Sequence, residues 1–200
     1  MTTATRNARV DRVTRETEIH LTLSVDGSGR AEIATPIPFF SHMLGALCRH
    51  ANLDVTLDVV GDVEIDQAHL VEGTGRVLGQ ALREAVADRS VIRRVGSAVV
   101  PVEEALALCA VDLAGRPFVA FAVQFAREEQ DGLELDLIPD FFRALAEESR
   151  ATWHLRLEAG EHEPHKVEAL FKAAGRALGD AVARDPARSS VIQSTKGPRA

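Results

Sequence analysis

The chain has 200 residues, of which 46% are hydrophobic and 26% charged, a composition close to that of soluble globular proteins with one ordinary domain or two small ones. This apolar content excludes a disordered chain, and 14 glycines, 8 prolines and 2 cysteines exclude collagen-like and disulfide-scaffold proteins. The formal net charge of −7 and the 4% of aromatic residues, with no tyrosine, argue against nucleic-acid binding.

The cysteines and the N-terminal segment point to an ordinary cytoplasmic protein. Cys48 and Cys109 lie in apolar runs, which favours buried side chains over metal ligands or a disulfide. The N-terminal segment has no apolar core of signal-peptide length. No stretch approaches the roughly 18 uninterrupted apolar residues of a membrane-spanning helix. We therefore expect a cytoplasmic location and no membrane partner.

The first half of the chain alternates between strand and helix patterns. Apolar residues alternate with polar ones on both sides of the glycine-rich segment 26–29, which predicts a β-hairpin. Further along, the apolar residues are spaced as in a helix, then alternate with polar residues as in a strand, and then are again spaced as in a helix. The expected elements are a hairpin, a helix, a strand and a helix, over residues 18–33, 39–51, 53–59 and 70–87.

The second half repeats this order with three strands ahead of its first helix. A polar tail follows the last helix. The expected elements are three strands, a helix, a strand and a helix, over residues 97–102, 106–113, 118–125, 136–150, 152–157 and 167–182.

The two halves also match in sequence. Residues His69–Val86 and His165–Val182 are identical at eight of 18 positions when set 96 residues apart. An internal duplication explains this match better than chance similarity between Ala/Leu helices. We expect an α+β fold of two β-β-α-β-α units, each an antiparallel-type sheet with two helices on one face, packed in layers. The half-repeats, 1–93 and 94–200, are expected to pack together as one domain.

Each half contains a histidine three residues before a glutamate at the start of a helix. His69 with Glu72, and His165 with Glu168, each share a helix face. Imidazole and carboxylate together suit Mn, Fe or Zn, although a solvated ion pair is the usual role of a single such motif. Its occurrence in both halves favours a metal site, and His42 is a further candidate ligand.

A second group of residues is basic. Arg116 lies in a Gly-Arg-Pro break between strands, and Lys196 follows Ser194 in the tail. With Arg94, these residues offer the guanidinium, ammonium and hydroxyl groups that bind a small phosphate. Surface charge is the alternative role, and it is expected for most of the 23 basic residues.

Several segments resemble imidazoleglycerol-phosphate dehydratase, in the same order from about residue 6 to residue 197. They include RETEIHLTLSVDGSGRAEIATPIPFFSHML, GDVEIDQAHLVEGTGRVLGQAL, RRVGSAVVPVEEALALCAVDLAGRPF and VIQSTKG. The resemblance implies a ribosomal protein S5 domain 2-like fold and a shell-like homo-oligomer of twenty-four subunits. It also implies active sites at subunit interfaces, each holding two Mn(II) ions.

The resemblance further implies the reaction and its residues. Imidazole glycerol phosphate would be dehydrated to imidazole acetol phosphate in histidine biosynthesis, with two metal ions stabilising the ring as imidazolate while a carboxylate shuttles the proton. Glu16 is the implied acid/base residue that contacts the substrate, and Glu72 and Glu168 are the other catalytic candidates. The implied phosphate-holding residues are Arg94, Arg116, Ser194 and Lys196.

The implied metal ligands depart from the family pattern. One centre would use His42, His69 and Glu168, and the other would use Glu72, Asp140 and His165. The family has two adjacent histidines at each helix start, whereas this chain has Ala68 and Pro164 as the first of each pair.

Two hypotheses follow from these departures. A two-histidine, one-carboxylate set still binds metals, so this chain would be an active dehydratase. The alternative is a diverged paralogue that keeps the fold and the phosphate pocket but has altered or lost two-metal chemistry. It would bind a phosphorylated ligand, act on another substrate, or take part in shell assembly. Loss of a residue that only supports a metal ligand lowers metal affinity or activity by about 10- to 100-fold, and loss of a metal ligand itself costs at least as much.

Overall fold

The computed structural model describes residues 6–61, 63 and 67–185. In its first half, three strands precede an alternation of helix, strand and helix. These elements are β1 (Asn7–Val13), β2 (Thr17–Ser24), β3 (Ala31–Ala34), α1 (Pro38–His50), β4 (Asp54–Gly61) and α2 (Ala68–Ala85).

The second half repeats the order after a short 3-10 helix, with a small hairpin and a second 3-10 turn inserted before its first α-helix. The elements are η1 (Arg89–Val91), β5 (Val95–Val102), β6 (Ala105–Asp112), β7 (Phe118–Ala122), β8 (Glu129–Gln130), β9 (Leu133–Glu134), η2 (Leu135–Leu137), α3 (Ile138–Ser149), β10 (Thr152–Ala159) and α4 (Glu163–Val182).

The two halves form two sheets of the same topology. The strand orders are β1-β2-β4-β3 and β5-β6-β10-β7. In each sheet the last neighbours, β4 with β3 and β10 with β7, run parallel, because a helix connects them as a crossover. Each sheet is therefore mixed: two of its three strand pairs are antiparallel, as expected for an antiparallel-type sheet, and this one is parallel. The duplicated unit is β-β-β-α-β-α, one strand longer than expected.

The predicted hairpin over 18–33 is wrong. β2 pairs with β1 and β4, whereas β3 pairs only with β4. The glycine-rich turn is tied to the start of β4, because Asp54 Oδ1 accepts hydrogen bonds from the backbone N–H of Ser28 at 2.8 Å and of Arg30 at 2.9 Å. These bonds turn the chain toward β4, so β3 becomes an edge strand instead of folding back on β2.

Strand β1 was not expected, although it forms the real hairpin with β2. Of its seven residues only Val10 is buried. An edge strand that buries one side chain shows no alternation of apolar residues, so its sequence carries little strand signal.

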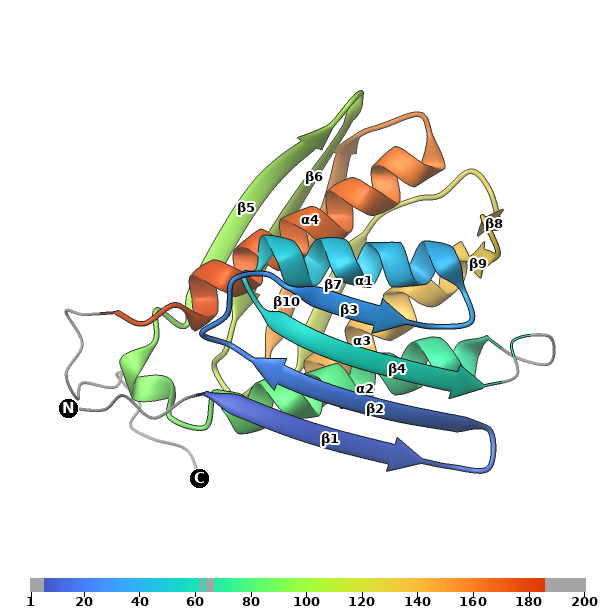
Figure 1. Ribbon diagram of the computed structural model, residues 1–200. Helices are drawn as coiled ribbons and strands as arrows, with labels where there is room; N and C mark the ends of the chain where they lie inside the picture. The colour runs from blue at the N-terminus through green and yellow to red at the C-terminus, as the bar shows by residue number, and fades with distance from the viewer. Residues whose placement is uncertain (1–5, 62, 64–66, 186–200) are drawn as a thin grey trace.

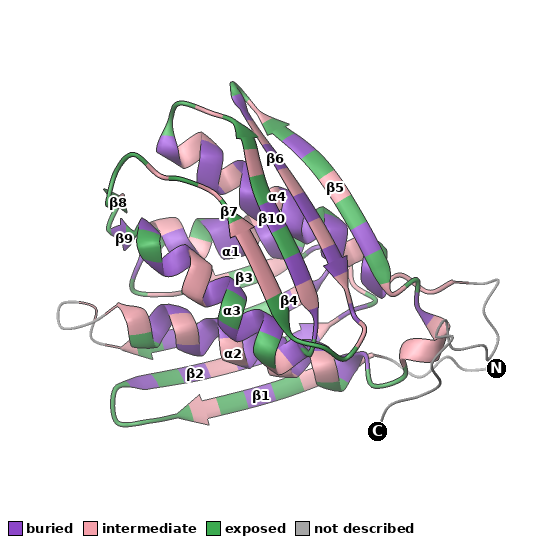
Figure 2. Cartoon of the chain, turned by 180° about the vertical axis from the view of Figure 1, so that it is seen from behind, coloured by how far each residue is buried: buried purple, intermediate pink, exposed green. Residues whose placement is uncertain are grey.

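The four α-helices lie between the two sheets, whose outer faces are exposed (Figures 1 and 2). Each helix pair joins the two halves: α1 packs against α4, and α2 packs against α3. At the first contact, a Cβ added to Gly175 would lie 2.3 Å from the backbone oxygen of Leu47, so only glycine permits this approach. One hydrophobic core runs through both halves.

The two cysteines are buried and free, as expected. Burial raises the pKa of both the Cys48 and the Cys109 thiol to about 12, so both stay protonated and inert. Within the described ranges, no helix is both long and apolar enough to cross a membrane.

Candidate active site

All four α-helices start at the same end of the molecule, on the right in Figure 1, which we call the helix-start end. Three of them have a proline in the first turn, where a missing N–H costs no hydrogen bond. The expected metal ligands lie in the first two turns of these helices. They are His42 on α1, His69 and Glu72 on α2, Asp140 on α3, and His165 and Glu168 on α4.

The structure brings Glu16 and His69 together. Glu16 lies in the turn between β1 and β2, and its Oε2 is 3.4 Å from Nε2 of His69. Thr14 shapes this turn, because its Oγ1 accepts the backbone N–H groups of Glu16 at 3.2 Å and Thr17 at 3.0 Å. The expected acid/base carboxylate and an expected metal ligand thus meet on one exposed surface.

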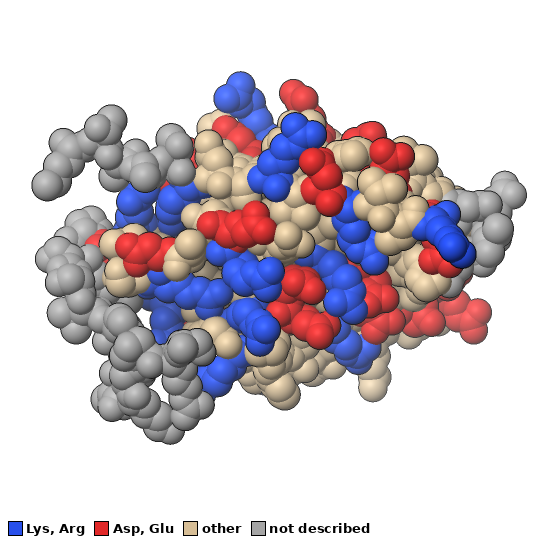
Figure 3. All heavy atoms as spheres, turned by 90° about the horizontal axis from the view of Figure 1, so that it is seen from below, with Lys and Arg blue, Asp and Glu red and all other residues tan. Residues whose placement is uncertain are grey.

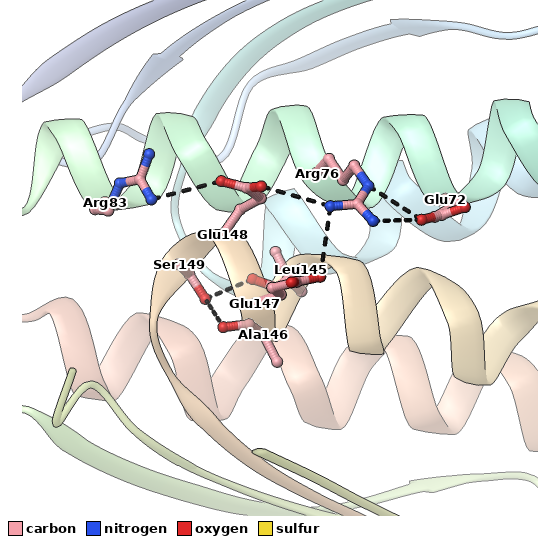
Figure 4. Close-up of polar contacts among 8 residues, drawn as sticks. All are labelled: Glu72, Arg76, Arg83, Leu145, Ala146, Glu147, Glu148 and Ser149. Atoms are coloured by element: carbon pink, nitrogen blue, oxygen red, sulfur yellow. Dashed lines mark hydrogen bonds and ion pairs between the residues drawn. The ribbon is translucent and has the colours of Figure 1, made fainter. Parts of the chain in front are cut away.

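Glu72 is held by a cation one helical turn further on. Arg76 donates from Nε and Nη2 to Glu72 Oε1, at 3.0 and 2.6 Å. Arg76 also pairs with Glu147 and Glu148 of α3, and Arg83 continues the row to Glu148 (Figure 4). Both bonds to Glu72 end on one oxygen, so the other oxygen of this carboxylate remains available to a ligand.

Glu168 has the equivalent partner in the second half. Lys172 Nζ lies 2.7 Å from Glu168 Oε1, at the same four-residue spacing. Lys172 and Arg176 also face His50 of α1, whose pKa is lowered first by burial and then by these cations. Sequence analysis did not single out Arg76, Lys172 or His50; the only available signal was the Glu-to-cation spacing, which is common on helices.

His165 is anchored by a carboxylate from a distant turn. Its Nδ1 lies 2.7 Å from Oε2 of Glu104, in the turn between β5 and β6. Hydrogen bonds from the backbone of His162, and then from the His165 ring, hold the pKa of Glu104 at about 2. Glu104 was missed by sequence analysis because 61 residues separate it from His165.

The remaining expected ligands do not join these groups within one chain. His42 is exposed on α1, and Asp140 pairs with Arg143 on its own helix at 2.5 Å. Among residues 6–61, 63 and 67–185, no three His, Cys, Asp or Glu side chains are close enough to hold a metal ion. The donor set itself, imidazole nitrogens and carboxylate oxygens, fits Mn(II).

The expected phosphate residues lie elsewhere. Arg94 precedes β5 with a left-handed φ of 72°, and its side chain bonds both oxygens of Asp112, at 2.7 and 3.1 Å. Arg116 is exposed in the loop between β6 and β7, where its carbonyl accepts a hydrogen bond from Thr152. Ser194 and Lys196 lie outside the described residues.

The described phosphate candidates, Arg94 and Arg116, lie at the opposite end of the subunit from the candidate metal ligands. The backbone N–H of Arg94 bonds the carbonyl of Ala181, in the last turn of α4, whereas His165 lies in its first turn. His165 and Ala181 are 16 positions apart in α4, which corresponds to about 24 Å of helix. Arg116 likewise lies beside the start of β10, while His165 follows its end. We call this second end the helix-finish end.

The surface charge follows the same axis. In the view from below, Lys and Arg side chains gather toward the left, where α2 ends and β5 begins (Figure 3). Asp and Glu side chains gather more toward the right, where α2 begins. On this face, basic groups suited to an anion are therefore densest at the end away from the start of α2.

Known proteins similar to this chain share one description. A family model described as imidazoleglycerol-phosphate dehydratase matches residues 35–178. The dehydratase of Symbiobacterium thermophilum is 50% identical over 194 residues, which is 97% of this chain and 93% of that protein. The dehydratase of Granulibacter bethesdensis is 48% identical over 193 residues, 96% of this chain and 98% of that protein.

Two crystal structures of such dehydratases have the same fold. The Staphylococcus aureus structure superposes with a TM-score of 0.81 at 31% identity, covering 90% of this chain and 99% of that one. The Pyrococcus furiosus structure, a complex with a compound named (S)-C348, gives a TM-score of 0.81 at 32% identity and covers 94% and 99%. The expected duplicated α+β fold is confirmed by these likenesses.

Proposed function

This chain belongs to the imidazoleglycerol-phosphate dehydratase family, and we propose that its active site forms between subunits, from the helix-start end of one chain and the helix-finish end of another. The reaction is the family's hydro-lyase step in histidine biosynthesis, the dehydration of imidazole glycerol phosphate.

The separation of the two ends is the observation that carries the proposal. About 24 Å of α4 lies between the turn that holds His165 and the turn that bonds Arg94. A substrate with an imidazole ring and a phosphate on a three-carbon chain is much shorter than this. One chain therefore cannot bind both groups of the substrate with these residues, but two chains in contact can. A homo-oligomer, with the twenty-four subunits implied by the resemblance, supplies such contacts.

The helix-start end would hold Mn(II). His42, His69 and Glu168 are proposed for one ion, and Glu72, Asp140 and His165 for the other. A bound divalent ion would supply the positive charge that stabilises the ring as imidazolate, which helps expel the hydroxyl from the carbon attached to the ring. Ala68 and Pro164 stand where a further imidazole would complete each set, so each centre binds its ion with fewer nitrogen ligands.

The protein residues move the proton and hold the substrate. Glu16 would take the proton from the second carbon of the side chain and return a proton to the hydroxyl on the carbon attached to the ring, which leaves as water. The resulting enol then becomes the ketone of imidazole acetol phosphate. The Glu16 side chain is 63% exposed and its Oε2 is 3.4 Å from His69, so it stands beside a proposed metal ligand and remains accessible to substrate. Arg94, Arg116, Ser194 and Lys196 are proposed to hold the phosphate with charge-assisted hydrogen bonds.

Mixing two inactive variants tests the proposal. Arg94→Ala removes a phosphate group from the helix-finish end, and His165→Ala removes a ligand from the helix-start end. Each alone should lose turnover of imidazole glycerol phosphate with Mn(II). After co-assembly in equal amounts, about a quarter of the sites combine two unaltered ends, so activity returns.

The matched control mixes Arg94→Ala with Arg116→Ala, which lie at the same end. If Arg94 and Arg116 of one site come from the same end of the same chain, this mixture recovers no activity. Recovery in the control but not in the first mixture contradicts a site formed from opposite ends. Light scattering that shows a monomer at micromolar concentration also contradicts it.

A further inference from the structure

Two hairpin turns, equivalent in the duplication, each bring a carboxylate to a histidine at a helix start. Glu16 in the β1–β2 turn reaches His69 of α2, and Glu104 in the β5–β6 turn reaches His165 of α4. The surroundings match as well, because α2 packs on β1 and β2 as α4 packs on β5 and β6. Glu104 therefore occupies the place in the second half that the proposed acid/base residue occupies in the first.

The two carboxylates are bound differently. Glu16 has a 63% exposed side chain and lies 3.4 Å from Nε2 of its histidine. Glu104 is 33% exposed and lies 2.7 Å from Nδ1 of His165. Its other oxygen, Oε1, accepts the backbone N–H groups of Glu161 at 3.2 Å and His162 at 2.9 Å. Three hydrogen bonds hold the Glu104 carboxylate, whereas the Glu16 carboxylate is more exposed and lies further from its histidine.

The segments around Glu104 are closely packed. The turn holds only two residues, since Val102 pairs with Ala105, and Glu103 has a left-handed φ of 48°. A Cβ added to Gly160 would lie 2.8 Å from Cγ of Lys166 and 3.1 Å from Cβ of Ala105. His162, the N-cap of α4, makes no capping bond with its own side chain. Glu104 thus ties the β5–β6 turn to the start of the helix that carries His165.

We propose that Glu104 is a positioning residue: it accepts the Nδ1–H of His165 and so presents the lone pair of Nε2 to a divalent metal ion. This rests on the proposed function, in which His165 is a metal ligand. A histidine whose Nδ1–H is held by a carboxylate has one tautomer, one ring orientation and a more basic Nε2. Two equivalent hairpin carboxylates then have different roles: Glu16 carries the proton, and Glu104 positions a metal ligand.

Mn(II) binding to the metal-free assembled protein, followed by electron paramagnetic resonance, tests this proposal without measuring catalysis. Glu104→Gln should weaken binding at the affected centre by about 10- to 100-fold, the usual effect of losing a group that orients a ligand. Glu161→Gln removes an exposed charge from the segment between β10 and α4 and leaves its backbone N–H in place, so it should bind Mn(II) as the parent does. If Glu104→Gln does not assemble, Glu104→Asp, which keeps the charge but shortens the side chain, takes its place in the same comparison.

Repeating the measurement in the His165→Ala variant shows whether Glu104 acts by orienting the His165 ring or by holding the surrounding segments in place. If Glu104 acts through His165, Glu104→Gln should have no further effect on Mn(II) affinity there. An equal loss in both backgrounds, or no loss in the parent background, overturns the proposal while leaving His165 as a ligand. If His165→Ala itself leaves affinity unchanged, the ligand assignment under the proposed function is wrong, and this proposal falls with it.

Discussion

The rings of Phe40 and Phe141 meet edge to face, with centroids 5.7 Å apart and planes at 86°. Phe40 belongs to α1 in the first half and Phe141 to α3 in the second. Phe141 also stacks on Phe171 of α4, at 5.6 Å. All three rings are fully buried, so this cluster joins the two halves at the centre of one core.

Phe141→Ala should lower the free energy of unfolding by about 3–5 kcal/mol, because it leaves a cavity between three helices. Unfolding should remain a single transition, since each helix pair combines both halves. Fluorescence of Trp153, the only tryptophan and a buried residue of the second half, can be compared with circular dichroism of the whole chain during denaturant unfolding. Two separate transitions would show that the half-repeats are independent domains.

Gly175→Ala should destabilise the protein by about 1–3 kcal/mol, because the new methyl group collides with the carbonyl of Leu47 where α4 crosses α1. Gly45→Ala on α1 is the matched control. Nothing lies within 4 Å of the Cβ it would add, so it should gain up to about 1 kcal/mol of helix propensity. Thermal unfolding of both variants measures the difference, and equal effects would contradict the close helix contact.

His20 should make stability depend on pH. Its Nδ1 lies 2.7 Å from Asp11 and its Nε2 2.8 Å from Glu18, and Asp58 is its register partner on β4. Hydrogen bonds to Asp11 and then Glu18 raise the pKa of His20 above its ordinary value of 6.5. The stabilisation is therefore complete below pH 6.5 and is lost as pH rises through the higher folded-state pKa.

Replacing His20 tests that pH dependence. His20→Asn should lower the melting temperature most between about pH 5 and 6, and the difference from the parent should shrink by about pH 9. A difference that is constant over this range would mean that protonation of His20 contributes nothing to stability.

Restoring the missing histidines should strengthen metal binding. With Ala68 and Pro164 in place of imidazoles, we expect the parent to keep fewer than two Mn(II) ions per site through dialysis. Ala68→His combined with Pro164→His should raise the metal content measured by elemental analysis, and turnover with it. Pro164 lies in the first turn of α4, so its replacement also removes a residue suited to that position.

If the double variant gains nothing, the metal content of the parent distinguishes an active dehydratase from a diverged paralogue. A parent that keeps two ions and turns over as fast as the double variant has a complete site without the two histidines. A parent that binds phosphate but neither Mn(II) nor substrate, with no gain in the double variant, would favour the diverged paralogue.

Much of the fold follows from local patterns. The order of the longer strands and the α-helices of the second half was predicted, whereas the short strands β8 and β9 and the two 3-10 helices were not. β1 was missed because one buried residue, Val10, makes no pattern. The wrong hairpin arose because Asp54, far along the chain, decides where the glycine-rich turn leads.

The sequence indicates which residue types belong to the candidate site, but not how they are arranged. His69 and Glu72 are visible as a motif because helix periodicity relates neighbours. Glu104 carries no local signal, since its contact with His165 depends on how a hairpin packs on a helix. The distance between Arg94 and His165 depends on the direction of α4 through the whole subunit, which no short motif records.

The common direction of the four helices makes the subunit electrically polar. Each helix carries roughly half a positive charge at its start and half a negative charge at its end, and in parallel helices these partial charges add. The carboxylates in the first turns of α3 and α4, Asp140 and Glu163, are stabilised at the positive pole, while Arg94 offsets the negative one. In the proposed contact between the helix-start end of one chain and the helix-finish end of another, unlike poles would face each other. The field therefore favours head-to-tail contacts, the kind that close into rings, over contacts between like ends.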